Sequence, residues 1–81
     1  MIALHRWNSE ADGAPVILLH GWTMTGEVWA PLAQHLPFPC LAPDLPGHGA
    51  TKDYAPDVAG GVALLGDLIA GHAVRDATLV G

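Results

Sequence analysis

The chain has 81 residues and a mass of 8.4 kDa, which allows one small domain and lies below the usual size of a catalytic α/β domain. Hydrophobic residues make up 51% of the chain and charged residues 14%, a composition that excludes an intrinsically disordered protein. Three Lys and Arg residues against eight Asp and Glu residues give a net charge of −5, so neither nucleic acid nor an anionic membrane is an expected partner.

The first half of the chain predicts two strands and one helix. Residues 2–7 are expected to form a first strand, and the continuous apolar run 16–19 is typical of a strand buried on both faces of a parallel sheet. A helix is expected to start at residue 29 or 30 and to end at residue 36, because proline is tolerated only in the first helical turn and Pro31 fixes that turn. The face expected to be buried has helical spacing and consists of Trp29, Leu32, Ala33 and Leu36.

The second half of the chain continues this alternation. Residues 40–42 are expected to form a short strand, and residues 43–49 a loop, because that segment is rich in Pro and Gly. Asp57 is expected to cap a helix that ends near residue 70, and residues 77–80 are expected to form the last strand. The helix face expected to be buried consists of Val58, Val62, Leu65 and Ile69.

Strands and helices in this order predict an α/β fold in which the strands of a parallel sheet are joined by crossover helices, in a β-α-β-α-β arrangement. Ligands of such sheets bind at the carboxyl ends of the strands. The unusual residues of this chain follow its predicted strands: His20, Gly21 and Trp22 after one strand, residues 44–48 after the next, and Gly81 after the last. We expect these strand ends to lie together.

Four sequence segments resemble the amino-terminal third of an α/β-hydrolase: Leu18-Leu19-His20-Gly21-Trp22, Glu27-Val28-Trp29, Asp44-Leu45-Pro46-Gly47-His48-Gly49 and Leu79-Val80-Gly81. Each segment is weak alone, but their order and spacing together are specific. The His-Gly-Trp and Glu-Val-Trp segments also resemble, more narrowly, the esterases that cleave the methyl ester of the pimeloyl-carrier protein. The resemblance implies that residues 1–81 are the amino-terminal part of a single α/β-hydrolase domain, truncated before the nucleophile elbow.

The resemblance also implies roles for particular residues. The backbone N–H of Trp22 is expected to belong to the oxyanion hole, and His20, Gly21 and Trp22 are expected to line the substrate site, with Gly21 allowing a sharp turn and a close approach to the substrate. Gly81 is expected to be the first glycine of the elbow. The serine nucleophile, the acid and the base of the triad would then lie outside the sequence, so the chain alone is expected to be inactive.

The function implied is that of a serine carboxylic ester hydrolase, which acts through an acyl-enzyme on a small-molecule ester or acyl substrate. Two alternatives stay open. One is another enzyme on the same scaffold, such as the lyase of menaquinone synthesis or a dehalogenase with aspartate at the elbow. The other is a non-catalytic, truncated fragment.

Other site types find little support in the sequence. His20, Asp44 and His48 follow strands, but no metal-ligand spacing accompanies them, and no phosphate-binding glycine motif follows any strand, so neither a metal nor another cofactor is expected. His20 is expected to order its loop through hydrogen bonds. The remaining histidines are not expected to act as a general base: His48 belongs to the Pro-Gly loop, and His5, His35 and His72 are expected at the surface or its boundary.

The location and association of the chain follow from its apolar segments. No apolar run approaches the roughly 20 residues that span a bilayer, and the amino terminus lacks the apolar region of a signal peptide, so a cytoplasmic protein is expected. Cys40 is the single cysteine, which excludes an internal disulfide and suits a small buried hydrophobe. Because so short a chain buries only about 60% of its unfolded surface, the fragment is expected to self-associate through exposed apolar surface.

Overall fold

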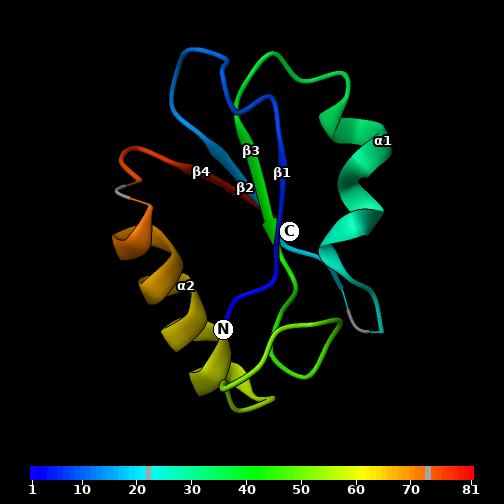
Figure 1. Ribbon diagram of the computed structural model, residues 1–81, viewed down its shortest axis with the longest axis vertical. Coiled ribbons are helices and arrows are strands. Elements are labelled where there is room, and N and C mark those ends of the chain that lie inside the picture. Colours follow the sequence, from blue (N-terminus) through cyan, green and yellow to red (C-terminus); the bar gives the residue numbers. More distant parts are fainter. Residues whose placement is uncertain (22, 73) are drawn as a thin grey trace.

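The computed structural model describes residues 1–21, 23–72 and 74–81 of the chain. A central sheet lies between two helical segments, with α1 on one side and α2 on the other (Figure 1). No helix among the described residues has the length and apolar character needed to cross a membrane. In chain order the elements are β1 (Leu4–Trp7), β2 (Val16–Leu18), the 3-10 helix η1 (Gly26–Trp29), α1 (Ala30–Ala33), β3 (Cys40–Pro43), α2 (Val58–Gly71) and β4 (Thr78–Val80).

The sheet is mixed, with the strand order β1-β3-β2-β4. β2 pairs in parallel with both β3 and β4, which confirms the parallel arrangement predicted for these three strands. β1 instead pairs with β3 in the antiparallel direction. Residues 8–15 join β1 to β2 without a crossover helix, and so short a connection does not return the chain to the end of the sheet from which β1 started. β1 is therefore an antiparallel edge strand on an otherwise parallel sheet.

Two apolar layers cover the two faces of the sheet. Leu18 packs with Ala33 and Cys40 on the face toward α1, whereas Ile17 packs with Leu41 and Leu68 of α2 on the opposite face. Neighbouring residues of each strand thus point to opposite faces, as the pleat of a strand requires. Both faces of β2 and β3 are buried in this way, which is why their sequences are continuously apolar.

The first helical segment is shorter and more tightly wound than its sequence predicts. The α-helical part starts at Ala30 with proline in its first turn, as expected, but ends at Ala33 instead of residue 36. The amides of His35 and Leu36 donate to carbonyls three residues earlier, which is the bonding of a 3-10 turn. On the predicted buried face, Ala33 is buried and Trp29 and Leu36 pack against the core, whereas Leu32 is 43% exposed.

The buried face of α2 differs from the predicted one. The helix buries Gly60, Leu64 and Leu68, while Val58 and Val62 of the predicted face are 84% and 65% exposed. Ile69 is also exposed, at 40%, and Leu65 is half-buried. Apolar residues occur on several sides of this helix, so periodicity alone does not select the face. Packing against the sheet decides it, since Leu68 contacts Ile17 and Leu41, while a Cβ at Gly60 would overlap the backbone of Ala55 in the preceding loop.

Two predictions about single residues are confirmed. The side chain of Asp57 accepts a 2.7 Å hydrogen bond from the amide of Gly60 and so caps the start of α2. Cys40 is 1% exposed, and its Sγ donates to the carbonyl of Phe38 at 3.3 Å. Burial raises the pKa of the Cys40 thiol, which suits an unreactive core residue.

Candidate functional site

The carboxyl ends of the three parallel strands lie together at one edge of the sheet, as the sequence predicts. β2 lies between β3 and β4, and the register places Leu18 opposite Val80. The amide of Leu19 donates a 2.7 Å hydrogen bond to the carbonyl of Val80 at this edge. The loop that follows β2 therefore starts between the loop that follows β3 and residue 81.

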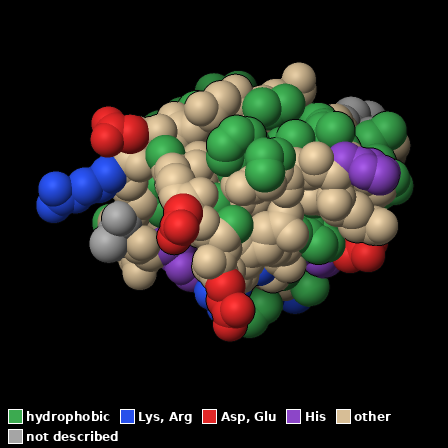
Figure 2. Space-filling model, turned by 90° about the horizontal axis from the view of Figure 1, so that it is seen from above, with side chains coloured by type: hydrophobic (Ala, Val, Ile, Leu, Met, Phe, Trp, Pro, Cys, Tyr) green, Lys and Arg blue, Asp and Glu red, His purple; other side chains and the backbone are tan. Residues whose placement is uncertain are grey.

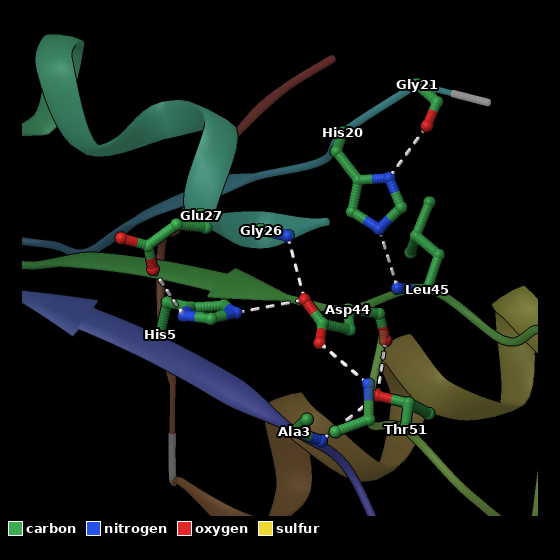
Figure 3. Close-up of polar contacts among 10 residues, drawn as sticks. Ala3, His5, His20, Gly21, Gly26, Glu27, Asp44, Leu45 and Thr51 are labelled. Carbon is green, nitrogen blue, oxygen red and sulfur yellow. Dashed lines mark hydrogen bonds and ion pairs between the residues drawn. The ribbon is translucent and has the colours of Figure 1, made fainter. Parts of the chain in front are cut away.

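His20 follows β2 and is buried, with 5% of its surface exposed. Its Nε2 lies 2.9 Å from the amide nitrogen of Leu45, and its Nδ1 lies 2.8 Å from the carbonyl oxygen of Gly21 (Figure 3). Because the amide only donates and the carbonyl only accepts, Nε2 is unprotonated and Nδ1 carries the proton. Both ring nitrogens are occupied, so His20 connects two loops and is poorly suited to serve as a general base.

Asp44 follows β3 and is 3% exposed. Its Oδ1 accepts hydrogen bonds from the amide of Gly26 at 2.8 Å and from Nε2 of His5 at 3.0 Å, and its Oδ2 accepts one from the amide of Ala50 at 3.0 Å (Figure 3). Burial acts to raise the pKa of this carboxyl, but the two amides together with His5 outweigh burial and hold the pKa below its usual value. Asp44 is thus a buried carboxylate whose bonds join three segments of the chain.

Thr51 is a further buried polar residue here, and it bonds to the backbone of Asp44. Its hydroxyl donates to the carbonyl oxygen of Asp44 and accepts a 3.0 Å hydrogen bond from the amide of Ala3. Thr51 is buried, at 7% exposure, so both bonds lie away from water. The loop that returns from β3 is therefore fastened to the amino-terminal segment as well as to the Asp44 side chain.

His5 lies between two carboxylates, a contact that the sequence does not reveal. Its Nε2 is 3.0 Å from Oδ1 of Asp44, and its Nδ1 is 3.1 Å from Oε2 of Glu27. The side chain is 29% exposed, which agrees with a boundary position. The contact arises because β1 pairs with β3 and places His5 opposite Ala42, two residues before Asp44. No local motif could have found it, since it depends on strand pairing over a long sequence separation.

Two glycines are required by the packing around Asp44. A Cβ added at Gly26 would overlap the carbonyl oxygen of Ala42 and the ring of His5. A Cβ added at Gly49 would overlap the Asp44 carboxylate, and Gly49 also has a φ of +55°, in the left-handed region that glycine favours. The second glycine of the Gly-His-Gly segment is therefore needed because a buried carboxylate lies against it.

The predicted oxyanion donor, Trp22, lies outside the described residues. Its neighbour Gly21 is exposed and not in the left-handed region, and among the described residues an added Cβ would contact only the sulfur of Met24, at 4.0 Å. The structure thus gives no backbone reason for glycine at this position, and close approach of a substrate stays a prediction. Thr23 has a φ of 65°, which costs a β-branched residue about 1–2 kcal/mol. Such strain is typical of functional loops.

Gly81 and the remaining histidines complete the list of predicted positions. Gly81 follows β4 and is exposed, and its role as the first glycine of an elbow stays a prediction. The rings of His20 and His48 lie edge to face, with centroids 5.1 Å apart. Within residues 1–21, 23–72 and 74–81, no three His, Cys, Asp or Glu side chains are arranged to hold a metal ion. His35 and His72 are exposed, as expected.

A sequence model of the alpha/beta hydrolase family matches residues 16–81, which is well over half of the chain. The chain belongs to the α/β-hydrolase family. The match begins at β2 and includes both loops that the His20 and Asp44 side chains connect. β1 and its His5 precede the matched region, so the α/β-hydrolase segment is braced by a residue that lies outside the match.

Several curated relatives of this α/β-hydrolase chain carry esterase or lipase names. The pimeloyl-[acyl-carrier protein] methyl ester esterase of Vibrio cholerae serotype O1 is 35% identical over 77 residues, which cover 93% of this chain and 29% of that protein. The protein of the same name from Stenotrophomonas maltophilia is 46% identical over 43 residues, 51% of this chain and 17% of its own. Lipase LipV of Mycobacterium tuberculosis is 50% identical over 44 residues, 53% and 17% of the two chains. The chain spans less than a third of each of these relatives.

Proposed function

We propose that residues 1–81 are the amino-terminal part of a serine carboxylic ester hydrolase that acts on a small-molecule ester or acyl substrate. The observation that carries the proposal is the shared sheet edge: the loop after β2 starts beside Val80 and is held by Leu45, so it borders Gly81, where the family resemblance expects the elbow to begin. The names of the relatives add support, since each of the three is called an esterase or a lipase.

Ester hydrolysis needs a fixed hydrogen-bond donor on this loop. When a serine oxygen attacks the carbonyl carbon, the electron pair of the C=O bond moves to the oxygen, which becomes an oxyanion. The base takes the serine proton and gives it to the departing alcohol as the oxyanion collapses to an acyl-enzyme, and attack by water, deprotonated by the same base, then releases the acid and restores the serine. A donor set in place beforehand stabilises the oxyanion without reorganisation, and we assign this role to the backbone N–H of Trp22. His20 and Gly21 form the adjoining part of the substrate site.

A chimeric enzyme tests this function. Residues 1–81 replace the matched segment of the Vibrio cholerae esterase, which supplies the rest of the domain. The chimera is expected to hydrolyse p-nitrophenyl acetate, and a serine-directed inhibitor is expected to abolish the turnover. The 81-residue chain alone is expected to show no turnover, because the resemblance places nucleophile and base outside it. A folded chimera without turnover, or inhibitor-sensitive turnover by the isolated chain, would contradict the proposal.

The oxyanion role of Trp22 is tested by a matched pair of variants in the chimera. Trp22→Pro removes the backbone N–H, whereas Trp22→Ala keeps it and removes only the indole. The proline variant is expected to lower kcat about 100-fold or more, the usual loss for one oxyanion donor. The alanine variant is expected to change KM more than kcat, since the indole is expected to line the acyl pocket. Circular dichroism shows whether both variants are folded, and equal kcat values in two folded variants would exclude the role.

A further inference from the structure

The loop after β2, residues 20–26, is fastened at both ends to two consecutive residues. At its start, Nε2 of His20 accepts a 2.9 Å hydrogen bond from the amide of Leu45. At its end, the amide of Gly26 donates a 2.8 Å hydrogen bond to Oδ1 of Asp44 (Figure 3). Asp44 and Leu45 follow β3 directly, at the sheet edge. The two ends of the loop are thus brought to one place, and we call the segment between them, of which the structure describes Gly21 and residues 23–25, the arch.

The described residues of the arch contact little of the core, so its two end bonds are its main attachment to the rest of the chain. Gly21, Thr23 and Met24 are exposed, and the amide of Met24 donates to the carbonyl of Gly21 at 3.2 Å, a long turn bond. Thr23 is held in the left-handed region despite its branched side chain. A strained and exposed segment keeps such a conformation only where its surroundings determine it. The buried hydrogen bonds of His20 and Gly26 hold the arch in this conformation.

His5 of β1 also contacts Asp44, and it reaches the residue that follows Gly26. Oδ1 of Asp44 faces Nε2 of His5, while Nδ1 of His5 faces Oε2 of Glu27, the residue that follows Gly26. Glu27 is 68% exposed, so its ion pair contributes little, whereas the Asp44 side chain is 5% exposed and its pair with His5 is shielded from water. His5 therefore braces Asp44 from β1, and Asp44 in turn braces Gly26.

We propose that Asp44 is the positioning residue of the oxyanion loop, and that His5 holds the Asp44 carboxylate in place for this task. The proposal rests on the proposed function. Asp44 touches no reacting atom: it fixes the end of residues 20–26 and thereby the direction in which the N–H groups of the arch point. A shift of the loop by about 1 Å is enough to lower the rate of a reaction that depends on aligned donors by about 100-fold.

Amide hydrogen exchange in the 81-residue chain tests the fastening without any need for activity. In Asp44→Asn, one oxygen is replaced by an NH₂ group, so one of the two amide donors loses its acceptor and the charge facing His5 disappears. The amides of Gly26 and Met24 are expected to exchange at least tenfold faster than in the wild type. The core amides of Ile17 and Leu41 are expected to change less than threefold. Asp12→Asn, at an exposed loop residue, is the matched control and is expected to leave all four amides unchanged.

A second variant keeps the test decisive if Asp44→Asn loosens the whole fold. His5→Gln leaves the carboxylate of Asp44 and its bond to Gly26 in place but removes the imidazole, with His35→Gln at an exposed histidine as its control. Exchange at Gly26 and Met24 is expected to rise severalfold in His5→Gln only. Unchanged exchange at both amides, or an equal rise at Ile17 and Leu41, would overturn the proposal.

Kinetics of the chimera separate the positioning role from the proposed function. Asp44→Asn is expected to lower kcat at least tenfold with KM within threefold of the unsubstituted chimera, because the loop still binds the ester but presents its donor less well. An active chimera whose kcat is unaffected by Asp44→Asn would overturn the positioning role alone. A folded chimera that lacks turnover before any substitution would overturn the proposed function and with it the catalytic role of Asp44, while the exchange data would still report whether the loop is fastened.

Discussion

At the sheet edge around Asp44, the chain supplies hydrogen-bond partners for a buried polar side chain. On the outer face of α2, it leaves apolar side chains exposed to water. At the edge, a carboxylate with 3% exposure receives donors from Gly26, Ala50 and His5. On α2, Val58 and Val62 are 84% and 65% exposed, although both are apolar. The polar cluster is assembled entirely from residues within this chain, whereas part of the apolar surface has no cover among the described residues. The comparison indicates that the Asp44 edge is held in place by this chain's own residues, whereas the outer face of α2 is not covered by them.

Exposed apolar side chains are not confined to α2. Figure 2 shows hydrophobic side chains gathered over the end of the molecule seen from above, with charged side chains mainly at its margins. Single exposed apolar residues are normal in folded proteins, but several large ones on a chain of this size mark a surface suited to further packing. Among the residues that the structure describes, nine large hydrophobic ones are at least 40% exposed: Met1, Met24, Val28, Leu32, Phe38, Val58, Val62, Ile69 and Leu79.

The largest expected effect comes from filling the space beside Asp44. Gly49→Ala places a Cβ against the buried carboxylate and forces alanine into the left-handed region, so we expect the free energy of unfolding to fall by about 2–4 kcal/mol. Gly66→Ala is the matched control in α2, where an added Cβ meets no described atom within 4 Å, and it is expected to raise that free energy by about 0.5–1 kcal/mol. Urea denaturation measures both, and equal effects would contradict the contrast between the two regions.

Acid is expected to weaken the Asp44 cluster to a smaller extent. Because folding lowers the pKa of Asp44, its contribution to stability is fully present above the ordinary carboxyl pKa of about 3.9 and is lost as the pH falls through the lower, folded value. The free energy of unfolding of the wild type should therefore fall more steeply below about pH 4 than that of Asp44→Asn. Urea denaturation between pH 7 and pH 3 checks this, and parallel slopes in the two chains would show that another group is responsible.

The sequence correctly predicts features that depend on residues close in the chain, such as where a helix begins. It mispredicts features that depend on tertiary packing, such as which face of a helix is buried. Pro31 and Asp57 mark the starts of two helices correctly, because a missing amide and a capping carboxylate act within one turn. The buried face of α2 is mispredicted, since its apolar residues surround the helix and the choice depends on the sheet, where Leu68 packs against Ile17 and Leu41. Local signals specify where an element begins, but its buried side is set by its neighbours.

The candidate site shows the same division. His20 is recognised because a histidine directly after a buried strand is unusual, and the structure gives it one hydrogen bond within its loop and one to the loop after β3. The importance of Asp44 is hidden, because a carboxylate in a Pro-Gly loop is normally solvated and only the strand pairing brings His5 against it. Thr51 is hidden for the same reason, since its partners Ala3 and Asp44 reach it from other segments.

The smallest expected effect on stability is on the outer face of α2, where a different measurement is needed. Val58→Glu combined with Val62→Glu alters side chains that are mostly in water, so the free energy of unfolding is expected to change by less than about 0.5 kcal/mol. Association is expected to change much more. The wild-type chain is expected to sediment as a dimer or larger species, because its exposed apolar face meets that of a second copy, and the double variant as a monomer.

A control variant separates the effect of added charge on association from the effect of lost apolar surface. Ala59→Glu combined with Ala63→Glu adds the same two charges at exposed positions of the same helix but keeps both valines. This control is expected to stay associated, since the apolar face of Val58 and Val62 remains. Equal dissociation of the two double variants would assign association to charge repulsion. A wild-type chain that is monomeric at every concentration would show instead that the outer face of α2 tolerates water, which would remove the contrast with the Asp44 edge.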